Sequence, residues 1–215
     1  FYTADLHFDH ALVSGLRGFA SPAEHDDAVC ARWRAAVDDR DIVWVLGDLA
    51  VTHNPSRLAA VLDRIGELPG VKHLILGNHD TAHPRFRDAH RHQRTYLQVF
   101  ESVQSMARRK VNGIEVMLSH YPYAGDHTES DRDNQYRLRD EGRWLMHGHT
   151  HSPVRWTGPR QVHVGLDAWS LSPVPESEIA RIIAQSSEPA RSPSSTAGSG
   201  TDNPATEEPG CSARS

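Results

Sequence analysis

Five short segments of the sequence place carboxylate, imidazole or amide side chains directly after apolar runs. They read DLH at 5–7, GD at 47–48, GNHD at 77–80, SH at 119–120 and HGHTH at 147–151. A turn after the apolar run at 74–76 needs Gly77 and accepts Asn78, but it does not need His79 and Asp80 as well. The chain also carries 15 histidines, spread from His7 to His163. Metal or acid–base chemistry is the leading interpretation.

The type and number of these side chains indicate which ions they could hold. Carboxylate, imidazole and amide groups form a mixed nitrogen and oxygen ligand set, which suits manganese, iron or zinc better than calcium. There are too many ligands for one ion, whereas two ions sharing a carboxylate would use them all. Taken singly, each segment also has an ordinary explanation as a hydrogen-bonded strand end, a turn or an exposed loop. The combination favours a site.

The elements around these segments predict an α/β fold. Residues 1–4, 41–48 and 71–76 read as strands, and helices are expected from Ser21-Pro22 and from Asn54-Pro55. This alternation predicts a buried parallel sheet, at whose carboxyl edge the polar segments would meet. A further helix is expected within 84–100 and a closing helix at 175–185. Residues 106–119 predict a hairpin that turns at Asn112-Gly113, and 143–148 and 162–165 are strand candidates.

Composition indicates how the chain divides into domains and which classes of binding partner it disfavours. Residues 1–186 read as one domain, and residues 187–215 as a disordered, low-complexity tail of Ser, Pro, Gly, Thr and Glu. A net charge of −5 and short apolar runs predict neither membrane association nor a stable nucleic-acid complex. The two cysteines, Cys30 and Cys211, lie far apart, which favours a cytoplasmic location. Nothing in the sequence indicates an oligomeric state.

The motifs DLH, GDL, GNHD, SHYP and GHTH, in this order, resemble the calcineurin-like metallophosphoesterases, and most closely their small, cap-less prokaryotic and phage members. The resemblance implies a sandwich of two mixed β-sheets flanked by helices. It also implies two metal ions with Asp48 between them. One ion would be held by Asp5, His7 and His151, and the other by Asn78, His120 and His149. His79 would lie near the phosphate as a catalytic residue, with Asp80 holding its ring.

The chemistry of such a site predicts a hydrolase. Two cations clamp a phosphate and lower the pKa of a bound water, so that the resulting hydroxide attacks phosphorus. His79 would then protonate the leaving alkoxide. We expect a phosphodiesterase acting on small or nucleotide-type diesters, cyclic nucleotides included, with manganese as the favoured metal. A phosphomonoesterase, a protein phosphatase or a nuclease are alternatives, as is a non-catalytic protein-binding scaffold, although such a scaffold should have lost a ligand.

Three further residues are weaker candidates for substrate binding. His10 is close enough to His7 to reach the site, Arg17 could hold a phosphate, and Tyr121 could stack on a base. Each also has a structural interpretation: His10 as a hydrogen-bond donor to a ligand, Arg17 as a surface arginine and Tyr121 as a packed aromatic. Asp167 either orients a histidine ligand or ends a strand. The long charged connection at 125–142 favours a lid that contacts substrate.

Overall fold

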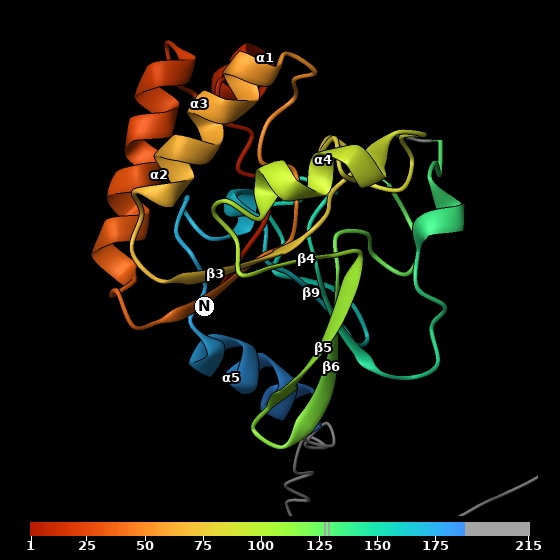
Figure 1. Ribbon diagram of the computed structural model, residues 1–215. Coiled ribbons are helices and arrows are strands. Elements are labelled where there is room, and N and C mark those ends of the chain that lie inside the picture. Colours follow the sequence, from red (N-terminus) through yellow and green to blue (C-terminus); the bar gives the residue numbers. More distant parts are fainter. Residues whose placement is uncertain (127, 129, 188–215) are drawn as a thin grey trace, which may run out of the picture.

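The computed structural model describes residues 1–126, 128 and 130–187. Two β-sheets lie face to face, with the earlier helices of the chain on one side and the C-terminal helix on the other (Figure 1). The α/β sandwich predicted from the sequence is therefore confirmed. The tail predicted at 187–215 lies, from residue 188 onward, outside the described residues.

The first sheet is parallel throughout, as the alternating pattern predicts, rather than mixed. Its order is β1-β2-β3-β4, formed by Tyr2–Thr3, Ile42–Val45, Val71–Ile75 and Ser102–Gln104. Neighbouring residues of β2 point to opposite faces, so Val43 and Val45 pack beneath the helices while Trp44 packs toward the second sheet. Burial on both faces explains why this strand reads as a continuous apolar run.

The second sheet is mixed and has the order β5-β6-β7-β9-β8. The strands are β5 (Met106–Val111), β6 (Ile114–Ser119), β7 (Trp144–His147), β9 (Gln161–His163) and β8 (Trp156–Gly158). The predicted hairpin joins β5 to β6, and its turn residues Asn112 and Gly113 have φ angles of 47° and 82°. Positive φ at both central positions matches a turn whose twist suits a two-residue hairpin. Strands β6, β7 and β9 are parallel to one another.

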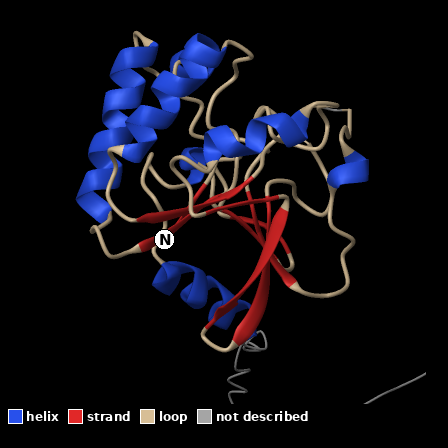
Figure 2. Ribbon diagram, viewed as in Figure 1, coloured by secondary structure: helices blue, strands red, loops and turns tan. Residues whose placement is uncertain are grey.

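Helices α2 (Pro22–Ala36) and α3 (Pro55–Gly66) begin where their capping residues predict. Ser21 Oγ accepts a hydrogen bond from the Glu24 amide at 3.2 Å, and Asn54 Oδ1 accepts from the amide of Ser56 at 3.0 Å. The Glu24 carboxylate returns to the amide of Ala20, one residue before the cap. These helices cover the outer face of the first sheet (Figure 2).

The sequence indicated only some of the remaining elements. Helix α4 (Ala89–Tyr96) and helix α5 (Glu176–Ser187) fall in predicted segments, whereas α1 (Ala11–Leu16) and strands β4 and β8 were not predicted. Single 3₁₀ turns follow at Asn134–Tyr136 (η1) and Leu166–Ala168 (η2). Within the described part of the chain, no helix is long and apolar enough to cross a membrane.

Candidate metal centre

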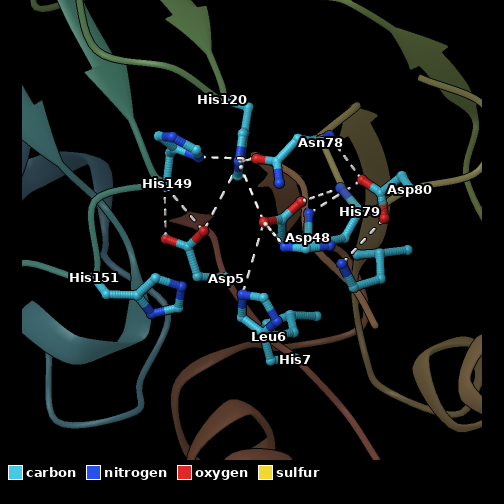
Figure 3. Close-up of polar contacts among 12 residues, drawn as sticks. Asp5, Leu6, His7, Asp48, Asn78, His79, Asp80, His120, His149 and His151 are labelled. Carbon is cyan, nitrogen blue, oxygen red and sulfur yellow. Dashed lines mark hydrogen bonds and ion pairs between the residues drawn. The ribbon is translucent and has the colours of Figure 1, made fainter. Parts of the chain in front are cut away.

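The loops that leave β1, β2, β3, β6 and β7 meet at one edge of the molecule, as expected for the carboxyl ends of parallel strands (Figure 3). Backbone hydrogen bonds join them: the amide of Asp5 donates to Gly47 O at 3.0 Å, and that of Gly148 donates to His120 O at 3.0 Å. Residues more than 140 positions apart in sequence are thereby brought into contact, as where the amide of His149 donates to Asp5 Oδ1 at 3.0 Å.

Six of the predicted ligands form two groups, in each of which three ligand atoms lie within 4.8 Å of one another. We call Asp5, His7 and His151 the first ligand group, and Asp48, His120 and His149 the second ligand group. Asp48 lies between them, because its Oδ2 is 3.7 Å from His7 Nε2 and 3.4 Å from His120 Nε2. One carboxylate oxygen thus faces a nitrogen of each group.

The backbone at these ligands is strained. Five of the ten non-glycine residues with positive φ among the described residues are candidate ligands: Asp5, His7, Asp48, His149 and His151, at 49–69°. Aspartate and histidine tolerate this region better than most residues, but each instance still costs of order 1–3 kcal/mol. Such strain persists where surrounding contacts hold it, and it is concentrated here at the polar edge.

Asn78 and two histidines converge within the second ligand group. Asn78 Oδ1 lies 2.8 Å from His149 Nδ1 and 3.0 Å from His120 Nε2. His120 Nδ1 donates to the carbonyl of Leu46 at 2.7 Å, which leaves the lone pair of a neutral His120 ring on Nε2. Burial lowers the pKa of His120, but the charges of Asp48 and Asp5 outweigh it and raise that pKa to about 9. The site favours a positive charge at this position, from a proton or a metal ion.

The first ligand group also fits a metal ion. His7 is 2% exposed and its two ring nitrogens lack a hydrogen-bond partner in the described structure, which is costly for a buried polar group. Burial lowers the pKa of His7 to about 3, so its ring is neutral and able to ligate. Although burial opposes it, the neighbouring His163, His151 and His120 hold the pKa of Asp5 well below its usual range.

Carboxylates behind the ligands orient two of the histidines. His151 Nδ1 donates to Asp167 Oδ2 at 3.0 Å, and His149 Nε2 lies 3.2 Å from Asp126 Oδ1. A carboxylate on the far nitrogen of a histidine fixes the ring and increases its basicity as a ligand. Asp126 was not predicted, because it lies in the irregular loop 125–142, where no periodicity marks a single carboxylate. Its side chain is fully buried there.

Asp80 binds the backbone of two ligand loops. Its carboxylate accepts hydrogen bonds from the amides of Gly77, Asp48 and Leu49 at 2.7, 3.1 and 3.1 Å. Burial and the charge of Asp48 raise the pKa of Asp80 to about 7. These contacts join the β2 and β3 loops and so fix Asp48, whereas a contact between Asp80 and the ring of His79 stays a prediction.

His79 lies on the solvent side of the ligands. Its amide donates to Asp48 Oδ1 at 2.9 Å, and its Nε2 is 3.9 Å from Asp48 Oδ2. The side chain is 38% exposed and lines a cavity of about 600 Å³ together with His7, Asp48 and Asn78. Burial lowers the pKa of His79. The ring is thus positioned beside, rather than within, the cluster of ligands.

The three weaker candidates lie in different surroundings. His10 lines the cavity, with its ring centroid 5.5 Å from that of His7. Arg17 makes a bidentate contact with Asp167 at 2.9 and 2.8 Å and donates to the carbonyl of Asp5 at 2.8 Å. Tyr121 is 2% exposed, and its ring packs against His120 and His149 at centroid distances of 5.1 and 4.9 Å. Arg17 and Tyr121 therefore contact the protein's own ligand loops.

Two sheets whose parallel strands end at a shared cluster of histidine and carboxylate side chains are typical of metal-dependent phosphoesterases. Residues 4–165 match the calcineurin-like phosphoesterase superfamily domain. The chain belongs to this superfamily, as the sequence motifs predicted.

Relatives and a solved structure extend this result. The Gene 66 proteins of Mycobacterium phages L5 and D29 are 45% and 46% identical to this chain, covering 78% and 81% of it and 86% and 92% of their own lengths. An uncharacterized protein of Methanocaldococcus jannaschii is 28% identical over 84% of this chain and 88% of its own. A crystal structure of an Aquifex aeolicus protein of unknown function shares the fold, with a TM-score of 0.62 and 20% identity over 84% of this chain and 97% of that one.

Proposed function

We propose that this protein is a dinuclear metal-dependent phosphodiesterase that hydrolyses small or nucleotide-type diesters. The position of Asp48 supports two ions more than any other observation, because one of its oxygens lies within 3.7 Å of a nitrogen from each ligand group. One ion would be held by the first ligand group, and the other by Asn78, His120 and His149, with Asp48 shared. Manganese is the favoured metal, since the ligands combine imidazole with carboxylate and amide oxygen.

Two bound ions would polarise the phosphoester and supply a water of lowered pKa as the nucleophile. The side chains would position the ions and assist the departure of the leaving group. Asp48 is held by the Asp80 loop contacts, so that both groups keep a fixed separation. His79 borders the cavity and is accessible to a leaving group, where its ring would donate a proton or a hydrogen bond to the developing alkoxide. In this proposal the catalytic residues are the ligands and His79, while Asp80 is a positioning residue.

The charge of the cavity favours a diester over a monoester. A diester carries one negative charge at neutral pH, whereas a monoester carries nearly two and needs more neutralisation. Among the described residues that line the cavity, the one guanidinium is that of Arg17, and it is paired with Asp167. Positive charge for the phosphate would therefore come from the ions and from histidine. We propose a cytoplasmic location on the basis of the two distant cysteines alone.

The proposal is tested by adding manganese to chelated protein and measuring hydrolysis of bis(p-nitrophenyl) phosphate and p-nitrophenyl phosphate side by side. A higher kcat/KM for the diester is expected, and the Asp48→Ala variant, with an unchanged circular-dichroism spectrum, should hydrolyse neither. A preference for the monoester would contradict the diester assignment but keep the metal centre. Binding of manganese without turnover of either ester would favour the scaffold interpretation.

A further inference from the structure

Helix α1 presents an apolar face to solvent beside the candidate metal centre. Leu16 and Leu12 are 78% and 67% exposed, the two highest values among the large hydrophobic side chains that the structure describes. They are four residues apart, so they project from the same side of the helix. Single exposed leucines need no explanation, but two together on one short helix form a patch.

This patch is part of the cavity that contains the metal ligands. Leu12, Val13, Leu16 and Val51 line it together with His7, Asp48, Asn78, His149 and His151. The volume of about 600 Å³ lies within the range of small-molecule sites, roughly 300–1,000 Å³, and exceeds what a phosphate group needs. A phosphate held by the ligands would therefore leave room for an organic group next to α1.

The side chains of α1 that line the cavity restrict the chemical type of organic group that could bind there. Residues 11–16 read ALVSGL and contain no charged side chain, so α1 offers no ion pair to a second phosphate. The helix itself is fixed, because Val13 and Ser14 are buried and Ser14 Oγ donates to His10 O at 2.8 Å. The ring of His10, the residue that caps the start of α1, borders the same cavity and adds a flat surface to it. An apolar, flat group would cover both surfaces.

We propose that Leu12, Leu16 and His10 form a subsite for an aromatic group of the phosphoester, which makes aryl- or base-bearing esters the preferred substrate class. This proposal rests on the proposed function, since it places the phosphate at the metal centre. It assigns α1 a role in recognising the organic group of the substrate, whereas the ligand motifs would contact only the phosphate.

The test measures binding rather than turnover, with the manganese-loaded full-length protein. Phenylphosphonate and methylphosphonate share a phosphonate head group and contain no ester bond to hydrolyse, so isothermal titration compares only their organic groups. The wild-type protein should bind phenylphosphonate about tenfold more tightly, as burial of a ring against two leucines predicts. In the double variant Leu12→Ser/Leu16→Ser, this preference should fall below about twofold while methylphosphonate affinity stays the same.

The matched control is Leu97→Ser, because Leu97 is 49% exposed and lies at the end of α4. It should keep the wild-type preference. Equal affinities in the wild-type protein, or a preference that survives the double substitution, would overturn the subsite. A parallel titration with hexylphosphonate distinguishes the ring from an alkyl chain: tighter binding than phenylphosphonate would refute the aromatic assignment.

Two further outcomes separate this proposal from its alternatives. If the wild-type protein is a dimer that the double substitution dissociates, α1 is an interface between copies and the proposal fails. If the protein hydrolyses neither test ester but shows the phenyl preference, the proposed activity fails and the subsite stands. If the protein hydrolyses a test ester but shows no preference for phenylphosphonate, the proposed activity stands and the subsite fails.

Discussion

The two ligand groups differ in how deeply they are buried. Every side chain of the second ligand group is at most 2% exposed, whereas His151 of the first is 28% exposed and borders the cavity. The second group is also more densely hydrogen-bonded: the carbonyl of Leu46 and the amide oxygen of Asn78 contact its histidines at 2.7–3.0 Å. In the first group, both ring nitrogens of His7 lack such partners among the described residues.

This difference indicates that the ligands of the second group are preorganised, whereas those of the first group are held less firmly before an ion binds. A buried, oriented ligand set loses little freedom when it binds a metal, so we expect the second group to hold its ion more tightly. Both groups contribute side chains to the cavity where substrate would enter, but the partly exposed ligand, His151, belongs to the first group. We therefore expect the weaker of two manganese-binding steps to belong to the first group.

The largest effect is expected at the residue that the groups share. Asp48→Ala removes an oxygen that faces both His7 and His120, so both ions should be lost and kcat/KM should fall by at least roughly 10²–10³-fold. Metal content after dialysis and diester hydrolysis measure the two effects. Loss of one ion only, with the other retained, would show that the groups are independent.

A smaller effect is expected at His79, which belongs to neither group. His79→Asn should leave the manganese content unchanged, since the ring lies 3.9 Å from Asp48 on the cavity side. The rate should fall by about 10²-fold, and more for esters with poor leaving groups, because a general acid is removed. Stopped assays with aryl diesters of increasing leaving-group pKa measure this. A variant that instead lost manganese would place His79 among the ligands.

Much of this architecture could be predicted from the sequence because it is encoded locally. Caps at Ser21 and Asn54 and the apolar strands set the elements of the first sheet and its helices, and the Asn112-Gly113 turn set the hairpin of the second sheet. The convergence of DLH and GNHD on one edge follows from the parallel order of the first sheet, and GHTH joins them from the end of β7 in the second sheet.

The support of the ligands could not be predicted, because it depends on long-range contacts. Asp126 faces His149 from an irregular loop, and Arg17 reaches Asp167 across 150 positions of sequence. Asp80 was assigned to its sequence neighbour His79, yet its carboxylate faces the backbone of another loop, some 30 residues earlier. Helix α1 is too short for periodicity to reveal it, and its exposed leucines read as ordinary apolar residues.

The third prediction tests the support of the second group. Asp126→Asn keeps the shape of the side chain but removes the charge 3.2 Å from His149 Nε2. The tighter manganese step should weaken by about 10–100-fold while the weaker step is unchanged. Two-site titration calorimetry measures both. Asp140→Asn is the matched control, because Asp140 lies on the same loop with a side chain 45% exposed; an equal loss there would mean that general loop charge is responsible.

The smallest effect is expected where the first group is supported. Asp167 accepts from His151 Nδ1 at 3.0 Å and is itself held by the fork of Arg17, which follows α1 directly. Burial raises the pKa of Asp167, but Arg17 and His151 outweigh this and hold it well below its usual range, so the carboxylate is charged at neutral pH. Asp167→Asn should weaken only the weaker manganese step.

We expect a loss of about tenfold at that step, at the lower end for ligand-orienting carboxylates, because His151 is partly exposed to solvent. Asp27→Asn removes an exposed carboxylate that is likewise paired with an arginine, and it should bind manganese as the wild-type protein does. If Asp167→Asn weakened the tighter step instead, the assignment of affinities to the two groups would be reversed. The buried group would then be the one that releases its ion first, and burial would no longer explain the difference between them.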